Sequence, residues 1–410
     1  MKRFIITFFV CFTGMTLFAQ NANMSYYSEE YSRPTATFID RLEVLEAVRD
    51  AKLTGIGEFY HDALKSLILK LPDMKTREDR DAVEAMARIL CQGLEAEKYA
   101  PAAPELWSIV QFFDVVRDVN DGLVMQDAFV ALGQVDAKDF LPHIVQWLDD
   151  LNTRETPDVE TRRRMQRGVV GAINALEALQ EEDGYKSVFF AYIGWYDPAI
   201  RDMAHKALPN ITDDPGDVIS KIIQDSSNPP NIKYVAWQEM VAAARAPNSS
   251  KAKVAAVALA TGWNYATSTP TYQRDLREMR KSAIDIIRLY GVEDDSVYVN
   301  LEKSYTNNFI NTAPDYDELR KTLETLSVIK TDEAVDLLYK FLQELHSRRR
   351  AGPWGITKER QLFNWIITGL GATKTQSQDV RLLLTTILRS QDYTGAEQGW
   401  ARDALAELGN

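Results

Sequence analysis

Residues 197 to 208 read Asp-Pro-Ala-Ile-Arg-Asp-Met-Ala-His-Lys-Ala-Leu, and this stretch decides the fold. Asp197 is a residue type favoured at a helix N-cap, and Pro198 suits the first helical position, where a backbone N–H has no partner anyway. The apolar residues that follow recur at helical spacing on one face: Ile200, Met203, Ala204, Ala207 and Leu208. Pro209 is expected to end this amphipathic helix.

The same design recurs along the chain at intervals of roughly 40 residues, which is a period typical of helical repeats. With Leu208 as the reference, the equivalent positions are Val48, Leu90, Leu132, Leu176, Met240, Ile287, Ser327, Leu370 and Leu408. A helix pair cannot bury its apolar face alone, so neighbouring pairs must stack. The sequence therefore predicts an all-α solenoid of antiparallel helix pairs, with about nine to ten repeats over residues 35–410. A helical bundle whose helices have similar lengths is the alternative.

The stretch from residue 197 to 208 resembles the second helix of a HEAT repeat, in which Asp-Pro precedes an apolar residue and Arg, and then Ala and Ala-Leu. A basic residue also occupies the place of Arg201 in three further units: Lys233, Arg280 and Arg320. Met125 and Phe363 stand there in two others, so a continuous Asp–Arg ladder is not expected. The resemblance covers most of the chain. It implies a right-handed superhelix of the HEAT or armadillo-like kind, with the Arg201-type helices on its inner side.

The N-terminus has the pattern of a secretory signal peptide. Lys2 and Arg3 precede a mostly apolar stretch that ends at Phe18, which is shorter than the roughly 20 residues a membrane-spanning helix needs. Cleavage after Ala19 is expected, which makes residues 1–19 the signal peptide and residues 20–34 a flexible leader. This predicts export to the periplasm, cell envelope or medium, with no stable membrane span in the mature chain. An uncleaved N-terminal anchor is the alternative.

The charge and cysteine content of the chain narrow the classes of partner that it could bind and the ways in which its fold could be stabilised. The formal net charge is -12, whereas nucleic-acid binding usually requires a basic surface, so no nucleic-acid partner is expected. Two cysteines occur in the whole sequence, and Cys91 alone remains after signal cleavage. A single thiol cannot form an intramolecular disulfide, and its place in an apolar run predicts a small core residue.

No catalytic, metal or cofactor motif is found. The four histidines are not spaced as metal ligands, and neither a phosphate-binding glycine loop nor a nucleophile elbow is present. Acidic clusters fall at expected helix ends, where carboxylates complement the helix dipole. No catalytic residue, metal or cofactor is therefore predicted. A helical envelope enzyme acting on glycan or peptidoglycan is the alternative, and it would need two carboxylates facing each other across a cleft.

Two segments are candidates for partner binding. The first, residues 262–272, lies in the longest interval between repeats and contains three large aromatic residues: Trp263, Tyr265 and Tyr272. The second is an expected connection over residues 347–360 that combines arginines with an aromatic residue: Arg348, Arg349, Arg350 and Trp354. Loops that cover an adjacent helix and solvated helix ends are the alternatives. A further basic run, residues 162–164 with Arg167, begins another helix.

Together these patterns favour an exported, non-enzymatic HEAT-like scaffold that binds a protein or peptide partner in the cell envelope. The hypothesis rests on the repeat pattern, the export signal and the lack of a catalytic motif. Function does not follow from fold, so the partner itself is not predicted.

Overall fold

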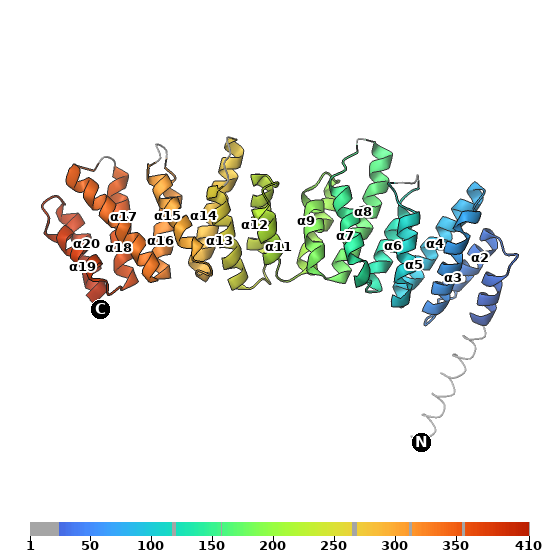
Figure 1. Cartoon of the computed structure of the whole chain (residues 1–410). Helices are drawn as coiled ribbons and strands as arrows, with labels where there is room; N and C mark the ends of the chain where they lie inside the picture. Colours follow the sequence, from blue (N-terminus) through green and yellow to red (C-terminus); the bar gives the residue numbers. More distant parts are fainter. Residues whose placement is uncertain are drawn as a thin grey trace, which may run out of the picture. The chain divides into compact units, whose positions relative to one another are not determined.

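The computed structural model describes residues 24–116, 120–156, 158–264, 269–310, 314–354 and 357–409. All regular secondary structure in these ranges is helical, which confirms the all-α prediction (Figure 1). The predicted signal peptide, residues 1–19, lies outside them. Within the described ranges, no helix combines the length and the apolar character that crossing a membrane requires.

Part of the expected flexible leader is helical, over residues 24–32. Tyr31, in this segment, is only 2% exposed, and its hydroxyl donates a hydrogen bond of 3.1 Å to the carbonyl oxygen of Ala63. The Arg41 guanidinium lies 5.2 Å from the centre of the same ring. Burial of this one aromatic side chain attaches the segment to the fold, which its polar composition did not indicate.

The chain divides into two compact units, and the N-terminal unit ends at Thr212. Its α-helices are α2 (Phe38–Asp50), α3 (Gly57–Lys70), α4 (Arg77–Glu97), α5 (Ala103–Phe112), α6 (Leu123–Gln134), α7 (Leu141–Asn152), α8 (Val159–Leu179), α9 (Tyr185–Ile193) and α10 (Pro198–Ile211). Short 3-10 helices occupy Leu71–Asp73, Ala100–Ala102, Lys138–Phe140 and Glu182–Gly184. Each even-numbered helix from α2 to α8 packs on the next even-numbered helix, and each from α4 to α10 also packs on the odd-numbered helix before it.

The C-terminal unit begins at Asp213 and repeats this arrangement. Its helices are α11 (Gly216–Gln224), α12 (Pro230–Ala242), α13 (Asn248–Asn264), α14 (Pro270–Tyr290), α15 (Ser296–Ile310), α16 (Tyr316–Ile329), α17 (Asp332–Ala351), α18 (Thr357–Thr373), α19 (Gln378–Arg389) and α20 (Gly395–Gly409). One row runs from α12 to α20 through the even-numbered helices, and a second runs from α11 to α19 through the odd-numbered ones. Each unit therefore consists of helix pairs stacked in two layers.

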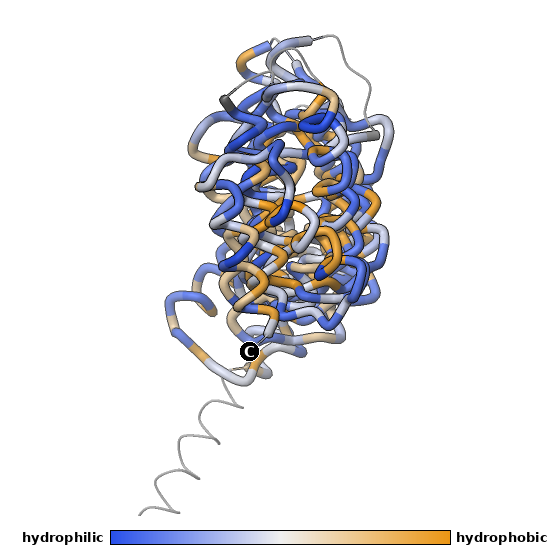
Figure 2. Tube along the Cα trace, turned by 90° about the vertical axis from the view of Figure 1, so that its left-hand side faces the viewer, coloured by the Kyte–Doolittle hydropathy of each residue, from blue (hydrophilic) through white to orange (hydrophobic). Residues whose placement is uncertain are grey.

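The sequence period coincides with the even-numbered helices of both units. The reference positions lie on α2, α4, α6, α8, α10, α12, α14, α16, α18 and α20, in that order. All of them are buried except Ser327, which is partly exposed. In Figure 2 the hydrophobic residues gather toward the middle of the trace and the hydrophilic ones toward its outside. The apolar stripes are therefore the faces on which the helices stack.

Two local expectations change in the structure. Pro209 lies inside α10, which continues to Ile211, because a proline in the last turn removes few backbone hydrogen bonds. Asp197 is at the N-cap position but makes no side-chain capping bond there. Cys91 is buried in α4, as predicted for a small core residue, and burial raises the pKa of its thiol.

Candidate binding sites

Trp263, the main aromatic candidate, lies at the end of α13 and is engaged by its own chain. Its indole Nε1 donates a hydrogen bond of 2.7 Å to Oγ of Ser304 on α15, and the Arg280 guanidinium lies 3.8 Å from its ring centre. Tyr272 is half-buried in the first turn of α14 rather than in a loop, and Tyr265 lies outside the described residues. Trp263 thus joins three helices and has only part of its surface free.

The three candidate arginines form the last turn of α17, so they do not belong to a connection as expected. Arg348 is exposed, bonds to Glu344 at 3.0 Å, and lies 4.4 Å from the ring centre of Phe309 on α15. Arg350 is exposed and Arg349 is half-buried. Their position fits the preference of cations for a helix C-terminus. Trp263 and Arg348 both contact α15, which packs on α13 and α17.

Trp354 is also held by its own chain. Its Nε1 donates a hydrogen bond of 2.9 Å to Oε1 of Glu397, and its ring centre lies 5.2 Å from that of Phe363. Arg349 lies 5.5 Å above the same indole ring. Trp263 therefore belongs to a cluster around Arg280, and Trp354 with Arg349 belongs to a cluster around Glu397.

Sequence reasoning missed the two buried carboxylates at the centres of these clusters. Glu318 is 0% and Glu397 is 1% exposed. Arg280 on α14 donates hydrogen bonds to both carboxylate oxygens of Glu318 on α16, at 2.8 and 3.0 Å. Arg360 on α18 reaches Glu397 on α20 at 2.9 Å. In both clusters an arginine of one even-numbered helix neutralises a glutamate of the next.

A signal for both glutamates was present in the sequence. Each stands three residues after an N-cap residue, which is the spacing of a capping box. Asp315 accepts the backbone N–H of Glu318 at 3.0 Å. The Glu397 carboxylate accepts the backbone N–H of Thr394 at 2.8 Å. Capping boxes usually lie at exposed helix ends, so the spacing alone does not show that these carboxylates are buried.

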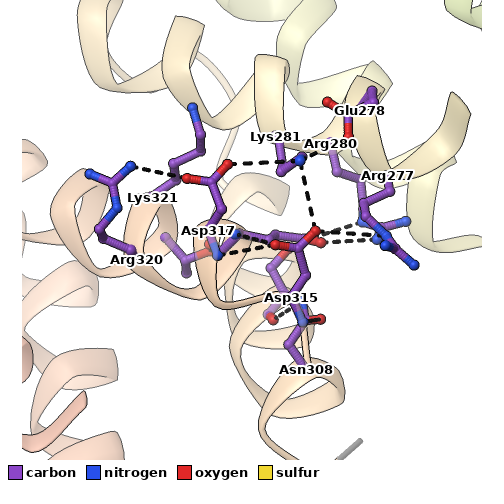
Figure 3. A network of polar contacts seen from close by, with 12 residues as sticks. Arg277, Glu278, Arg280, Lys281, Asn308, Asp315, Asp317, Arg320 and Lys321 are labelled. Atoms are coloured by element: carbon purple, nitrogen blue, oxygen red, sulfur yellow. Dashed lines mark hydrogen bonds and ion pairs between the residues drawn. The ribbon is translucent and has the colours of Figure 1, made fainter. Parts of the chain in front are cut away.

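A wider polar network surrounds the Arg280 cluster between α14 and α16 (Figure 3). The Lys281 ammonium lies 2.8 Å from Glu278, 3.8 Å from Asp315 and 3.7 Å from Asp317. Burial opposes the charge of Lys281, but these three carboxylates outweigh it and raise the pKa of the amine. Arg277 adds a contact of 3.7 Å to Asp315. The contacts of 3.7 and 3.8 Å to Asp315 and Asp317 are those of weak ion pairs between the two helices.

The N-terminal unit contains a charged cleft of about 430 Å³ where α4 and α8 project beyond the start of α6. The three helices can be compared by aligning their reference positions, Leu90, Leu132 and Leu176. At a rise of about 1.5 Å per residue, the start of α8 then lies about 12 Å beyond the start of α6, and the start of α4 about 6 Å beyond it. The wall from α4 includes Arg80 and Glu84, and the wall from α8 includes Glu160, Arg163 and Arg164. The cleft therefore brings arginines and carboxylates from two helices to one place.

Ion pairs within this unit occupy most of the carboxylates of the cleft. The pairs are Glu84 with Arg80 at 3.1 Å, Asp121 with Arg167 at 3.4 Å, and Asp81 with Arg77 at 3.9 Å. Arg163 is exposed and forms no ion pair with any residue of the described ranges. Arg164 donates from Nη2 to Oγ1 of Thr161 at 2.9 Å, while its Nε and Nη1 are buried without a described partner. The arginines of α8 thus retain unused donors.

A second cleft, of about 420 Å³, lies in the C-terminal unit beside Lys233, Thr261 and Ser296. The Lys233 ammonium donates to the carbonyl oxygens of Ile223 and Asp225 at the end of α11. Burial lowers the pKa of this amine. The cation of this cleft therefore stabilises a helix end.

The histidines differ in their surroundings. His61 is 7% exposed, and its Nε2 lies 2.9 Å from Glu105. His346 Nδ1 lies 2.7 Å from the Tyr393 hydroxyl. The described residues include no group of three or more side chains arranged to hold a metal ion.

Comparison with protein-family models and with the sequences of curated proteins finds no match to this chain.

Proposed function

We propose that this chain is an exported, non-enzymatic scaffold that binds a protein or peptide partner in the cell envelope. In this proposal the stacked helix pairs form a right-handed, HEAT-like superhelical solenoid. The observation that supports it is the packing of every even-numbered helix on the next even-numbered one within each unit. Stacked pairs use their apolar faces for one another, so the polar helix faces and the helix ends remain for recognition.

Two ion pairs support a rigid role for the even-numbered row of the C-terminal unit: the Arg280–Glu318 pair is buried on both sides, and the Arg360–Glu397 pair is buried at the glutamate. A buried arginine–glutamate pair has a defined geometry, because each group loses water and must find its partner. Arg280 with Glu318 joins α14 to α16, and Arg360 with Glu397 joins α18 to α20. A surface that is ordered before binding loses less conformational entropy when a partner docks.

The proposed partner surface is the edge formed by the ends of α13, α15 and α17. Arg348 and Arg350 supply exposed cationic donors there, and Tyr272 and Trp263 supply partly exposed aromatic surface. Trp263 and Trp354 also position this edge through their bonds to Ser304 and Glu397. Tyrosine, tryptophan and arginine are the residue types that contribute most to protein interfaces.

The test is affinity capture of tagged mature protein from its own cell envelope, with mass spectrometry of the proteins that accompany it. A double variant, Arg348→Ala with Arg350→Ala, is expected to stay folded and to lose the captured partner. The matched control is Arg389→Ala with Arg402→Ala, because these exposed arginines lie on α19 and α20 outside the proposed edge. Equal capture by both double variants would place the partner surface elsewhere.

The cleft of the N-terminal unit favours one alternative, an envelope enzyme that acts on glycan or peptidoglycan. Glu84 on α4 and Glu160 on α8 line opposite walls, as a two-carboxylate hydrolase requires. Glu84, however, is paired with Arg80, which is the environment of a structural ion pair rather than of a proton donor. Release of soluble fragments from purified peptidoglycan by the wild type, abolished by Glu160→Gln, would support the enzyme and contradict the scaffold.

A further inference from the structure

A histidine–tyrosine contact attaches α17 to the connection between α19 and α20, residues 390–394. Nδ1 of His346 on α17 lies 2.7 Å from the hydroxyl oxygen of Tyr393 in this connection, and the two rings are nearly parallel, at 10°. Within the described ranges, no other hydrogen bond joins α17 to residues 390–394. The attachment of the connection to α17 therefore depends on the state of one imidazole.

The direction of this hydrogen bond follows from the chemistry of its two groups. Tyr393 is 4% exposed, and burial is the largest of the effects that raise the pKa of its hydroxyl. The hydroxyl therefore keeps its proton and needs an acceptor, which Nδ1 of a neutral imidazole provides. An imidazolium carries a hydrogen on both ring nitrogens and accepts none. Protonation of His346 thus leaves the Tyr393 hydroxyl without an acceptor among the described residues.

The charges closest to His346 also favour its neutral form. Burial and the positive charge of Arg350 lower the pKa of His346 from the ordinary value of 6.5, and Asp392 in the connection opposes them more weakly. Arg349 and Arg350 stand three and four residues after His346, and so on the same side of α17. His346 lies before the last turn of this helix, where the helix dipole would favour a cation.

The other elements around Tyr393 add one carboxylate that is already paired. Glu397 on α20 acts on the Tyr393 hydroxyl, but Arg360 on α18 lies 2.9 Å from this carboxylate. Arg348, two residues after His346 and so on another side of α17, contacts α15 instead. The carboxylate of Asp392 is therefore the main negative charge that would favour an imidazolium at His346.

We infer that His346 and Tyr393 form a pH-dependent switch, which holds residues 390–394 to α17 while the imidazole is neutral and releases them when it is protonated. His346 is half-buried, and its Nε2 bonds to no described residue, so solvent protons can reach the ring. Histidine is the residue type whose charge ordinarily changes between about pH 5 and about pH 8. The switch acts without a partner, so it stands apart from the proposed function.

The direction of the effect follows from the lowered pKa of His346. The attachment is complete above the ordinary value of 6.5 and is lost as the pH falls through the lower value of the folded protein. Each unit between the two values corresponds to about a tenfold change in the equilibrium between the attached and released states.

The first experiment is an NMR titration of the full mature chain with labelled histidines. The His346 signal is identified by its loss in His346→Asn, and its midpoint is expected below 6.5. Tyr393→Phe should raise this midpoint, because the neutral imidazole loses its hydrogen bond. His143 is the control in the same spectra, because it is exposed and stacks on Trp107 in the N-terminal unit. A His346 midpoint at or above 6.5, or one that Tyr393→Phe leaves in place, would overturn the inference.

The second experiment follows the connection itself by hydrogen exchange and mass spectrometry. Backbone amides of residues 390–394 are compared at about pH 7.5 and about pH 5, after correction for intrinsic rates, because Glu397 stays ionised over this range. Exchange in the wild type should be faster at the lower pH, by up to about tenfold for each unit by which the His346 midpoint lies below 6.5.

His346→Asn is the matched variant, because its side-chain oxygen remains an acceptor at both pH values. It should show the same corrected exchange at both. Equal acceleration of the wild type and His346→Asn would assign the effect to Asp392 or Glu397 and overturn the inference, as would a wild type without acceleration. Tyr393→Phe, which lacks the bond at every pH, should exchange rapidly at both values, so it tests the switch even where His346→Asn perturbs folding.

Discussion

The guanidinium of Arg280 binds both carboxylate oxygens of Glu318, at 2.8 and 3.0 Å, and connects α14 to α16 in the interior of the C-terminal unit. The carboxylate is fully buried, and the arginine also donates to the carbonyl oxygen of Gly262 at 3.0 Å. Trp263 covers the guanidinium from one side. One arginine therefore ties together α13, α14 and α16, so its partners should be strongly coupled in stability.

Glu318→Ala is predicted to lower the free energy of unfolding by about 3–5 kcal/mol, because it leaves the Arg280 charge buried without its partner. A double variant, Arg280→Met with Glu318→Leu, should recover most of this loss, since apolar residues of similar volume need no pairing. Urea denaturation of Glu318→Ala, of the single variants Arg280→Met and Glu318→Leu, and of the double variant measures the loss and the coupling. A loss below about 0.5 kcal/mol for Glu318→Ala, which is the range of ordinary surface substitutions, would contradict the prediction.

Ala204→Arg is predicted to destabilise the N-terminal unit by more than about 3 kcal/mol. Ala204 is 0% exposed on the apolar stripe of α10, where a long charged side chain has neither space nor a partner. Thermal unfolding followed by circular dichroism is the measurement. Asp202→Arg is the control, because Asp202 is exposed on the same helix. An unchanged melting temperature for Ala204→Arg would show that the stripe is misplaced.

Gly133→Ala is predicted to destabilise, although alanine normally favours a helix interior over glycine by about 1 kcal/mol. A Cβ at this position of α6 would lie 2.7 Å from the backbone Cα of Ala175 on α8, so the two helices would have to separate. Gly399→Ala on α20 is the control, because a Cβ there has nothing within 4 Å. We expect a lower melting temperature for the first variant and an equal or higher one for the second. The same sign for both would refute the close approach of α6 and α8.

Glu397 is predicted to make the melting temperature of the protein depend on pH. Burial alone would raise the pKa of its carboxyl, but hydrogen bonds from Thr394, Trp354 and Arg360 outweigh burial and lower the pKa from the ordinary value of 4.5. A lowered pKa in the folded state means that the stabilisation is complete above the unfolded value and is lost as the pH falls through the folded value. Melting temperatures measured between about pH 6 and about pH 3 should fall more steeply for the wild type than for Glu397→Gln. Parallel curves would falsify this.

The mature protein is predicted to begin at Gln20. Lys2 and Arg3 followed by a short apolar stretch are typical of a cleaved signal peptide. N-terminal sequencing of protein purified from its native cells is the measurement. A native chain that still begins at Met1 would favour the uncleaved anchor instead.

Local patterns determined the helices and their apolar faces. The spacing of Ile200, Ala204 and Leu208 predicts a helix with one apolar face, because side chains three and four residues apart lie on the same side of a helix. The recurrence of that pattern identified a position on every even-numbered helix from α2 to α20. These inferences succeeded because each depends on neighbours within a few turns of the chain.

The candidate sites depended on distant residues, and the sequence was a weaker guide to them. Trp263 and Trp354 were predicted as partner contacts from their residue type, and only the tertiary structure shows that their indole nitrogens also bond to Ser304 and Glu397. Glu318 and Glu397 carried the spacing of helix caps, whereas their burial arises only when a second helix places an arginine beside them. Whether a polar side chain is free or engaged is decided by residues some forty positions away.

The charged cleft also combines features that the sequence predicts with features that only the tertiary structure decides. The basic run over residues 162–164 was visible in the sequence, and so was the helix that follows it. Its role as one wall of a cleft follows from the greater length of α4 and α8 relative to α6 and from the packing of both on α6. Helix periodicity depends on residues that are close in the chain. A cleft arises from a difference in length between helices that folding brings together. The sequence by itself therefore determined the helices and their stacking faces, and the tertiary structure decided which charges remain available to a partner.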